Sequence, residues 1–239
     1  MQKTGKDYIV FPLDVPGLEP ARKLVEQLDG QVGMFKIGLE LFIAEGPAVV
    51  RMIKELSQAR IFLDLKLHDI SATVGRAMGR VADLGVDLVT VHCASREMLE
   101  AAVEGGKGKA GVLGVTLLTD NDAAMVEAGG FKSEFVENPQ ALVLKRAGFA
   151  KAAGCAGVVC SGQEAGAIKS EFGSDFLAVT PGIRPQWSLL EKDDQKRVTT
   201  PADAVSMGSD LIVIGRPIRE ADSPAKAAEM VAQEVQAVL

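Results

Sequence analysis

The amino-acid sequence predicts an α/β protein that folds as a single (β/α)₈ barrel, a TIM barrel, over residues 1–239. Short apolar runs recur at intervals of roughly 25 residues, and a segment of helical period follows each of them. No linker or low-complexity segment interrupts this alternation. Eight evenly spaced strand–helix units fit a closed parallel barrel better than the alternative, an open doubly wound sheet.

The expected strands are short and apolar, and polar sequence of helical period separates them. They lie at 8–14, 34–39, 61–66, 87–92, 111–117, 157–160, 176–180 and 211–214. The expected helices are amphipathic, with apolar residues on one face. They lie at about 18–29, 41–58, 72–84, 95–105, 138–153, 163–172, 200–207 and 223–238.

Local signals support several of these boundaries. Ser95 and Ser223-Pro224 stand where two helices are expected to begin, and these residue types are typical of helix starts. Glycines occupy the turns between helix and strand, where a left-handed residue is needed, at Gly85, Gly154, Gly173 and Gly208. Two connections are longer than usual. The first, 119–138, is expected to hold a short helix near 122–127, and the second, 181–199, is a candidate lid.

Composition limits the possible partners. The chain has 47% apolar and 24% charged residues, as ordinary soluble globular proteins do. A net charge of −6 and a pI of about 5.1 argue against a broad nucleic-acid-binding surface. No apolar run reaches the roughly 18 residues of a membrane span, and no signal peptide opens the chain. The three cysteines lack CxxC spacing and fit a reducing compartment. We therefore expect a cytoplasmic protein without nucleic-acid or membrane partners.

The third expected strand carries two charges that a buried strand normally lacks. Because side chains alternate along a strand, Asp64 and Lys66 share one face and the leucines between them share the other. Opposite charges on the inner side of a barrel must pair, because an unpaired buried charge is costly. A structural ion pair or an exposed edge strand would explain the pattern, and so would a catalytic Asp–Lys pair at the end of a barrel strand. Asp69 has the opposite parity and could point away from its own barrel centre.

The other strand ends add further polar and charged residues. In barrels of this kind the active site lies where the strands end. The residues expected there are Asp14, Lys36, His92, Thr116, Thr119, Arg184, Gly215 and Arg216. Gly215 allows a backbone N–H to approach an anion closely, and the guanidinium of Arg216 matches phosphate oxygens. Gln195, in the 181–199 connection, could close over the same phosphate.

Four motifs give the chain a family resemblance. They are Phe35-Lys36-Ile37-Gly38, Asp64-Leu65-Lys66-Leu67-His68-Asp69-Ile70, Thr180-Pro181-Gly182-Ile183-Arg184-Pro185 and Ile214-Gly215-Arg216-Pro217-Ile218. With these motifs, in this order and over nearly the whole chain, the sequence resembles orotidine 5′-phosphate decarboxylase of the bacterial type. The DxKxxD spacing alone is shared with sugar-phosphate relatives, and the last two motifs make the resemblance specific.

The resemblance implies decarboxylation of orotidine 5′-monophosphate to UMP in de novo pyrimidine biosynthesis by a homodimer. Lys66 would be the acid that protonates C6 of the pyrimidine, and Asp64 would lie beside the substrate carboxylate. Lys36, Asp64, Lys66 and Asp69 would form an alternating charged network. Asp69 and Thr73 would reach the partner subunit's site.

The same resemblance implies the substrate-binding residues. Asp14 and Lys36 correspond to ribose-binding positions, and Thr119 corresponds to a position near the pyrimidine. The positions that bind the lid and the phosphate are matched by Arg184, Gln195, Gly215 and Arg216. The stretch that precedes Gln195 is a residue or two longer than is usual for bacterial members of the family. Asp120 stands where a serine is common.

No cofactor or metal is expected. Most decarboxylases use a cofactor as an electron sink, but the sequence has no GxGxxG, no P-loop and no clear metal cluster. The Lys66 ammonium would stabilise the developing carbanion and then supply the proton. His68 and His92 are expected to serve in packing, hydrogen bonding or a dimer contact rather than in binding a metal.

Three other functions remain open on the residues alone. A magnesium-dependent sugar-phosphate decarboxylase or aldolase would need a further carboxylate on the second or third strand, where Lys36 and Phe62 stand. A Schiff-base aldolase would need a neutral Lys66, whereas neighbouring carboxylates favour the charged form. A non-catalytic protein that binds a phosphate ligand would not require the charged row.

Overall fold

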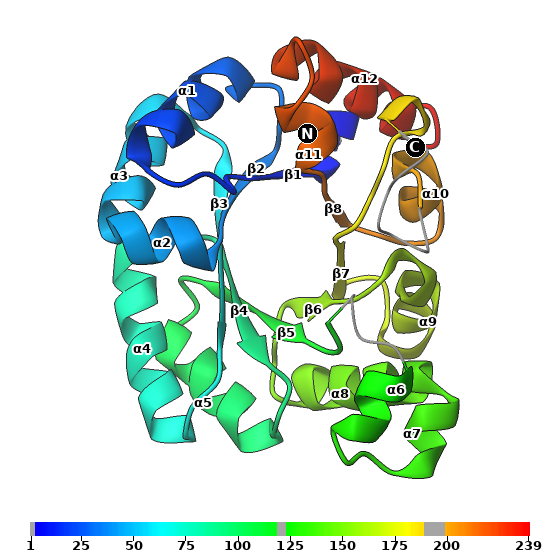
Figure 1. Ribbon diagram of the computed structural model, residues 1–239. Helices are drawn as coiled ribbons and strands as arrows, with labels where there is room; N and C mark the ends of the chain where they lie inside the picture. The colour runs from blue at the N-terminus through cyan, green and yellow to red at the C-terminus, as the bar shows by residue number, and fades with distance from the viewer. Residues whose placement is uncertain (1–2, 119–122, 189–198) are drawn as a thin grey trace.

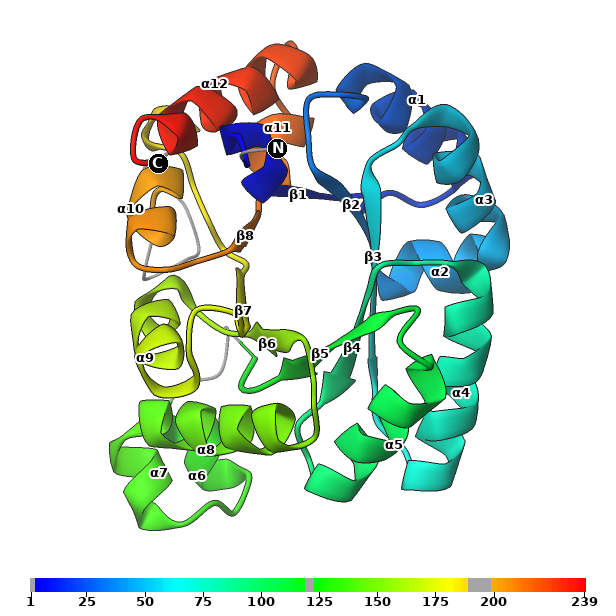
Figure 2. The same ribbon diagram turned by 180° about the vertical axis from the view of Figure 1, so that it is seen from behind.

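The structure, a computed structural model, describes residues 3–118, 123–188 and 199–239. In these segments eight parallel strands follow one another around a closed barrel, and β1 pairs with both β2 and β8 (Figure 1). The helices form a ring outside the strands, which is also seen from behind (Figure 2). The predicted (β/α)₈ barrel is therefore confirmed, and the alternative of an open sheet is wrong.

The strands agree with the predicted runs to within a few residues. They are β1 (Ile9–Pro12), β2 (Met34–Ile37), β3 (Arg60–Leu67), β4 (Leu88–His92), β5 (Gly111–Val115), β6 (Gly157–Val159), β7 (Leu177–Thr180) and β8 (Leu211–Val213). The first strand begins later than predicted because Tyr8 belongs to a 3₁₀ helix, η1 (Gly5–Tyr8). The fifth strand ends at Val115, two residues before the predicted end.

The helices cover the outer face of the barrel. They are α1 (Leu18–Leu28), α2 (Leu39–Glu45), α3 (Pro47–Leu56), α4 (Ser71–Leu84), α5 (Arg96–Gly106), α6 (Ala123–Ala128), α7 (Ser133–Glu137), α8 (Pro139–Ala152), α9 (Gly162–Phe172), η2 (Gln186–Ser188), α10 (Pro201–Ser206), α11 (Arg216–Arg219) and α12 (Pro224–Gln236). The short helix predicted near 122–127 corresponds to α6. None of the described helices is long and apolar enough to cross a membrane.

The single helix predicted over 41–58 is wrong. Two helices, α2 and α3, occupy this stretch, and Gly46 separates them with a positive φ of 56°. A glycine adopts this left-handed conformation without steric penalty. Pro47 then takes the first position of α3, where its missing N–H breaks no helical hydrogen bond.

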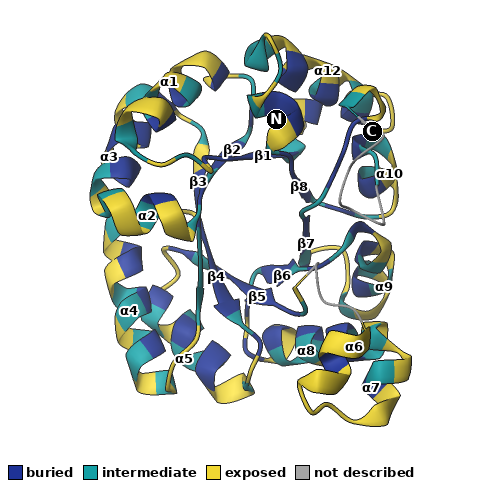
Figure 3. Cartoon of the chain, in the orientation of Figure 1, coloured by how far each residue is buried: buried dark blue, intermediate teal, exposed yellow. Residues whose placement is uncertain are grey.

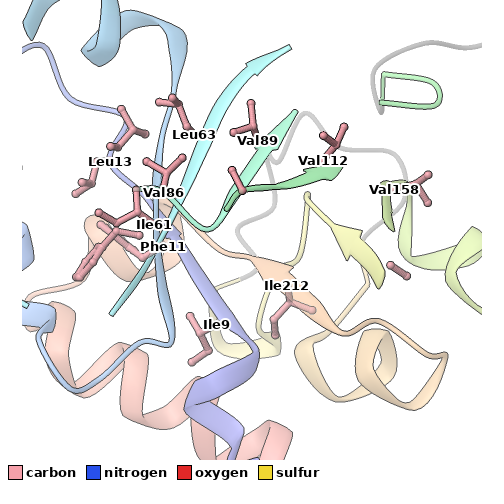
Figure 4. Close-up of a cluster of buried hydrophobic side chains, with 14 of the residues drawn as sticks. Ile9, Phe11, Leu13, Ile61, Leu63, Val86, Val89, Val112, Val158 and Ile212 are labelled. Carbon is pink, nitrogen blue, oxygen red and sulfur yellow. The ribbon is translucent and has the colours of Figure 1, made fainter. Parts of the chain in front are cut away.

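Two apolar layers explain the stability of the barrel. One fills the barrel interior and consists of Val10, Met34, Phe62, Leu88, Leu113, Val179, Leu211 and Val213. The other lies between the strands and the helices and includes Ile9, Phe11, Leu63 and Val89 (Figure 4). The buried strands and the buried inner faces of the helices are apparent in Figure 3. Since side chains alternate, the inward positions that follow Met34 and Phe62 are those of Lys36 and Asp64.

Helices α4 and α5 pack closely because glycines line their contact. A Cβ at Gly105 would stand 2.2 Å from the carbonyl oxygen of Gly75. A Cβ at Gly79, one turn further along α4, would meet nothing nearer than the Gly105 carbonyl oxygen at 3.9 Å. The first position therefore excludes a side chain, and the second has room for one.

Gly105→Ala should lower the free energy of unfolding by about 1–3 kcal/mol, because the helices must separate to admit the methyl group. The matched change Gly79→Ala should raise it by up to about 1 kcal/mol through helix propensity. Urea unfolding at one fixed protein concentration measures both. Equal effects of the two substitutions would contradict this account of the helix contact.

Candidate active site

Charged side chains from three adjacent strands meet at the carboxyl ends of these strands, next to the apolar layer that fills the barrel interior. Lys36 lies on β2, Asp64 and Lys66 lie on β3, and Asp14 follows the end of β1. The Lys36 Nζ atom is 3.5 Å from Asp14 Oδ1 and 3.4 Å from Asp64 Oδ2. The Lys66 Nζ atom is 2.9 Å from each oxygen of Asp64. The structure thus brings together four of the predicted site residues in one row.

Asp64 is the centre of this row. Its Oδ1 atom also accepts a hydrogen bond of 2.8 Å from the hydroxyl of Thr90 on β4. The Asp64 and Lys36 side chains are only 13% and 11% exposed, whereas Lys66 is 32% exposed and Asp14 is 53% exposed. Both oxygens of the buried carboxylate are therefore hydrogen-bonded or paired, while Lys66 retains access to a substrate.

The backbone of β3 is irregular where it presents Lys66. The pairing of β3 with β4 shifts in register between Leu63 and Leu67. Lys66 has a φ of 49°, a left-handed conformation that is uncommon outside glycine. Its backbone N–H donates to the Thr90 hydroxyl at 2.9 Å. The expectation that Leu65 and Leu67 face outward holds, because both pack against the outer apolar layer.

The electrostatics of the row favour an ionised Asp64. Burial alone would raise the pKa of this carboxyl. The positive charges of Lys36 and Lys66, with hydrogen bonds from Lys66 and Thr90, outweigh burial and hold the pKa below its ordinary value of 3.8.

The two histidines stand side by side near the row. The ring centroids of His68 and His92 are 5.3 Å apart. Burial, with the nearby positive charges of His68, Arg146 and Lys66, lowers the pKa of His92, which favours its neutral form. The described part of the chain has no cluster of three or more His, Cys, Asp or Glu side chains that could hold a metal ion.

Asp69 and Thr73 lie outside the row. Asp69 is exposed after β3, and its Oδ1 atom accepts the backbone N–H of Ile70 at 2.7 Å. Thr73, in the first turn of α4, accepts a hydrogen bond of 3.3 Å from Arg76. Of the ion pairs formed by the described residues, none joins Lys66 to Asp69. A single chain therefore does not bring Asp69 to Lys66.

The residues expected to bind phosphate are placed at the ends of β7 and β8. Arg184 is buried, and its backbone N–H donates to the Thr199 carbonyl. Arg216 is exposed at the start of α11, directly after Gly215. A Cβ at Gly215 would stand 2.9 Å from Pro12 Cγ, so this position has no room for a side chain. Thr119 and Gln195 lie outside the described residues.

Sequence reasoning missed three residues that hold the site. Thr90 contacts both Asp64 and Lys66, Arg219 donates to the Asp14 carbonyl at 2.8 Å, and Arg146 donates to the Thr116 carbonyl at the end of β5. Thr90 lies two positions before His92 and shares its inward parity, so alternation could have found it. The two arginines come from helices, and no motif signals their targets.

Comparisons with known proteins agree with this geometry. Residues 7–231 match the family described as "Orotidine 5′-phosphate decarboxylase / HUMPS family". The chain is 49% identical to orotidine 5′-phosphate decarboxylase of Desulfosudis oleivorans, over 99% of this chain and 96% of that protein. It is 44% identical to the enzyme of the same name from Halorhodospira halophila, over 99% of both chains. The crystal structure of orotidine 5′-phosphate decarboxylase from Lactobacillus acidophilus is similar with a TM-score of 0.81 and 33% identity, covering 95% of this chain and 98% of that one.

Asp64→Asn should lower the free energy of unfolding at pH 7 by about 1–3 kcal/mol, because it leaves Lys36 with only the more exposed Asp14 as an anionic partner. Since the folded-state pKa of Asp64 is depressed, its ionisation stabilises the fold above the ordinary pKa of 3.8. This contribution disappears as the pH falls through the folded-state value. Urea unfolding from pH 7 to pH 3 should therefore show the two proteins converging in stability at the acid end, and a difference that does not change with pH would contradict the argument.

Proposed function

Because the chain belongs to the orotidine 5′-phosphate decarboxylase / HUMPS family, the enzyme is a carboxy-lyase that converts orotidine 5′-phosphate to UMP, and we propose how its residues carry out this step. The observation that carries the proposal is the Lys66 ammonium, held 2.9 Å from both oxygens of a buried Asp64 at the end of β3. The whole chain, 1–239, is proposed to act as one catalytic domain.

Lys66 is proposed as the group that stabilises and then protonates the reacting carbon. When the bond between C6 and the carboxylate breaks, carbon dioxide leaves and the electron pair stays on C6. A fixed ammonium beside that carbon lowers the energy of the developing carbanion. The ammonium then gives a proton to C6 and regains one from solvent. The pair with Asp64 holds the ammonium in place for this role.

Asp64 is proposed to lie beside the substrate carboxylate. Its low pKa keeps it anionic, so two negative charges face each other before the bond breaks, and the charge of the substrate moves from the carboxylate to C6 as carbon dioxide leaves. Relief of this repulsion would favour the reaction. Lys36 pairs with Asp64 and Asp14 and would aim both carboxylates.

The distal parts of the substrate are assigned to the other strand ends. Asp14 and Lys36 are proposed to bind the ribose hydroxyls, and Arg216, the Gly215 backbone, Arg184 and Gln195 are proposed to bind the phosphate. Thr119 is proposed to contact the pyrimidine. Binding energy from the phosphate, far from C6, can be used to orient the reacting group.

The catalytic row is proposed to be completed by a second subunit. Asp69 is exposed and has no ion pair with Lys66 in its own chain, although it lies only three residues after Lys66. The apolar side chain next to it in the chain, Ile70, is also 72% exposed. In a two-fold dimer such a surface contacts its own copy, which would bring Asp69 and Thr73 to the partner's Lys66.

The first test measures the loss of orotidine 5′-phosphate absorbance with EDTA in excess. The wild-type enzyme should turn over without added metal, and Lys66→Ala should reduce kcat at least about 10³-fold because it removes both the proton donor and the stabilising charge. Lys107→Ala is the matched control. This exposed lysine also has a positive φ, of 50°, but it caps α5 away from the row, so kcat should stay within about twofold. A Lys66→Ala enzyme with wild-type turnover would refute the assigned role.

The shared site is tested by mixing two inactive variants. Lys66→Ala and Asp69→Ala chains should each lack activity as homodimers. After subunit exchange at equal amounts, about one quarter of the wild-type activity should appear, because about half of the dimers are mixed and each has one intact site. The exchange itself is followed with a mass-tagged chain. Confirmed mixed dimers without activity would rule out a contribution of Asp69 across the interface.

A further inference from the structure

We infer that Thr90 is a positioning residue of this reaction, whose hydroxyl fixes both the carboxylate of Asp64 and the backbone of Lys66. The inference rests on the proposed function of Asp64 and Lys66, and adds a neutral residue of the neighbouring strand to the charged row.

The hydrogen-bond geometry determines the direction of each contact. The Lys66 backbone N–H donates to Thr90 Oγ1 at 2.9 Å. The ionised carboxylate of Asp64 can only accept, so the Thr90 hydroxyl proton points to Asp64 Oδ1 at 2.8 Å. One hydroxyl is thus both acceptor and donor, and it links the main chain of the proposed acid to the side chain of its partner.

Each contact constrains a different feature of the site. The bond to the Lys66 N–H satisfies a donor that the register shift of β3 removes from the regular ladder, in a residue whose φ is 49°. The bond to Oδ1 fixes the plane of the carboxylate, so that Oδ2 faces Lys36 and both oxygens face the Lys66 ammonium. Without the Thr90 hydroxyl, the Asp64 carboxylate could rotate, and the Lys66 ammonium would no longer be held in one position.

Burial makes these contacts effective. Thr90 is fully buried, with no exposed surface, and Leu88, two positions earlier on the same face of β4, belongs to the interior apolar layer. Water therefore does not compete for the hydroxyl. A buried group that loses its partner there has no replacement.

A second hydroxyl in the chain has the same bonding pattern and provides a matched control. Ser57 precedes the N-terminal end of β3. Its hydroxyl donates to Asp29 Oδ1 at 2.6 Å and accepts the backbone N–H of Ala59 at 3.0 Å. It is also buried. This hydroxyl joins an aspartate to a backbone N–H in the same way, but no residue of the charged row contacts it.

The experiment compares Thr90→Val, Thr90→Ser and Ser57→Ala by kcat, by the dissociation constant of UMP and by thermal stability. Thr90→Val keeps the shape and removes the hydroxyl, and it should lower kcat about 10- to 100-fold while the UMP constant changes less than about threefold. Thr90→Ser keeps the hydroxyl and should restore kcat to within about threefold. Ser57→Ala should lower stability and leave kcat within about twofold.

The inference is overturned by any of three results. They are a Thr90→Val enzyme with kcat within twofold of wild type, a Thr90→Ser enzyme as slow as Thr90→Val, and a Ser57→Ala enzyme that loses as much kcat as Thr90→Val. If the valine chain does not fold, Thr90→Cys takes its place, because a thiol is only a weak donor. The wild-type rate in the same series tests the proposed function by itself. A wild-type enzyme without turnover would contradict the proposed function, whereas an active wild type with an equally active Thr90→Val variant would contradict only the inference on Thr90.

Discussion

A single buried carboxylate organises the proposed active site. Asp64 is shared by two lysines and one threonine hydroxyl, and its side chain is only 13% exposed. An isolated charge at this depth would take up a proton, because burial favours the neutral form. The two neighbouring lysines reverse this preference and hold the pKa of Asp64 below its ordinary value. Because each of these groups contacts Asp64, a substitution of this residue affects every contact of the row.

The closed barrel provides the frame for this row. Three neighbouring strands carry Lys36, Asp64 with Lys66, and Thr90, so hydrogen-bonded pairing between strands fixes the separation of their Cα atoms. The apolar layer fills the rest of the barrel interior. In this layer Val10, Met34 and Phe62 lie on the inward faces of β1, β2 and β3. On β2, β3 and β4 the polar groups occupy the last inward positions. A costly charged cluster is thus held by an apolar layer that supplies stability from the same strands.

Much of this arrangement follows from the sequence, and the exceptions have physical reasons. Alternation along residues 61–70 predicts that Asp64 and Lys66 face inward, because period two is a property of any strand. The left-handed Lys66 could not be predicted, since it depends on the register shift against β4 and on a hydroxyl from that strand. Gly46-Pro47 is a sequence signal for the break between α2 and α3. The amphipathic pattern continues on both sides of it, however, and therefore predicted a single helix. Arg146 and Arg219 reach strand ends from helices, and only the folded chain determines those distances.

The backbone at Lys66 connects stability with chemistry. A left-handed conformation at a non-glycine residue raises the energy of the folded state by about 1–3 kcal/mol, and a regular strand would avoid it. A regular strand would also place the Lys66 N–H in the ladder with β4 rather than on the Thr90 hydroxyl. The fold therefore retains a local strain at the residue proposed to transfer the proton. Because that strain is balanced by contacts of Thr90 and Asp64, a change that relaxes the strand would stabilise the chain while moving the ammonium away from the carbon that it is proposed to protonate.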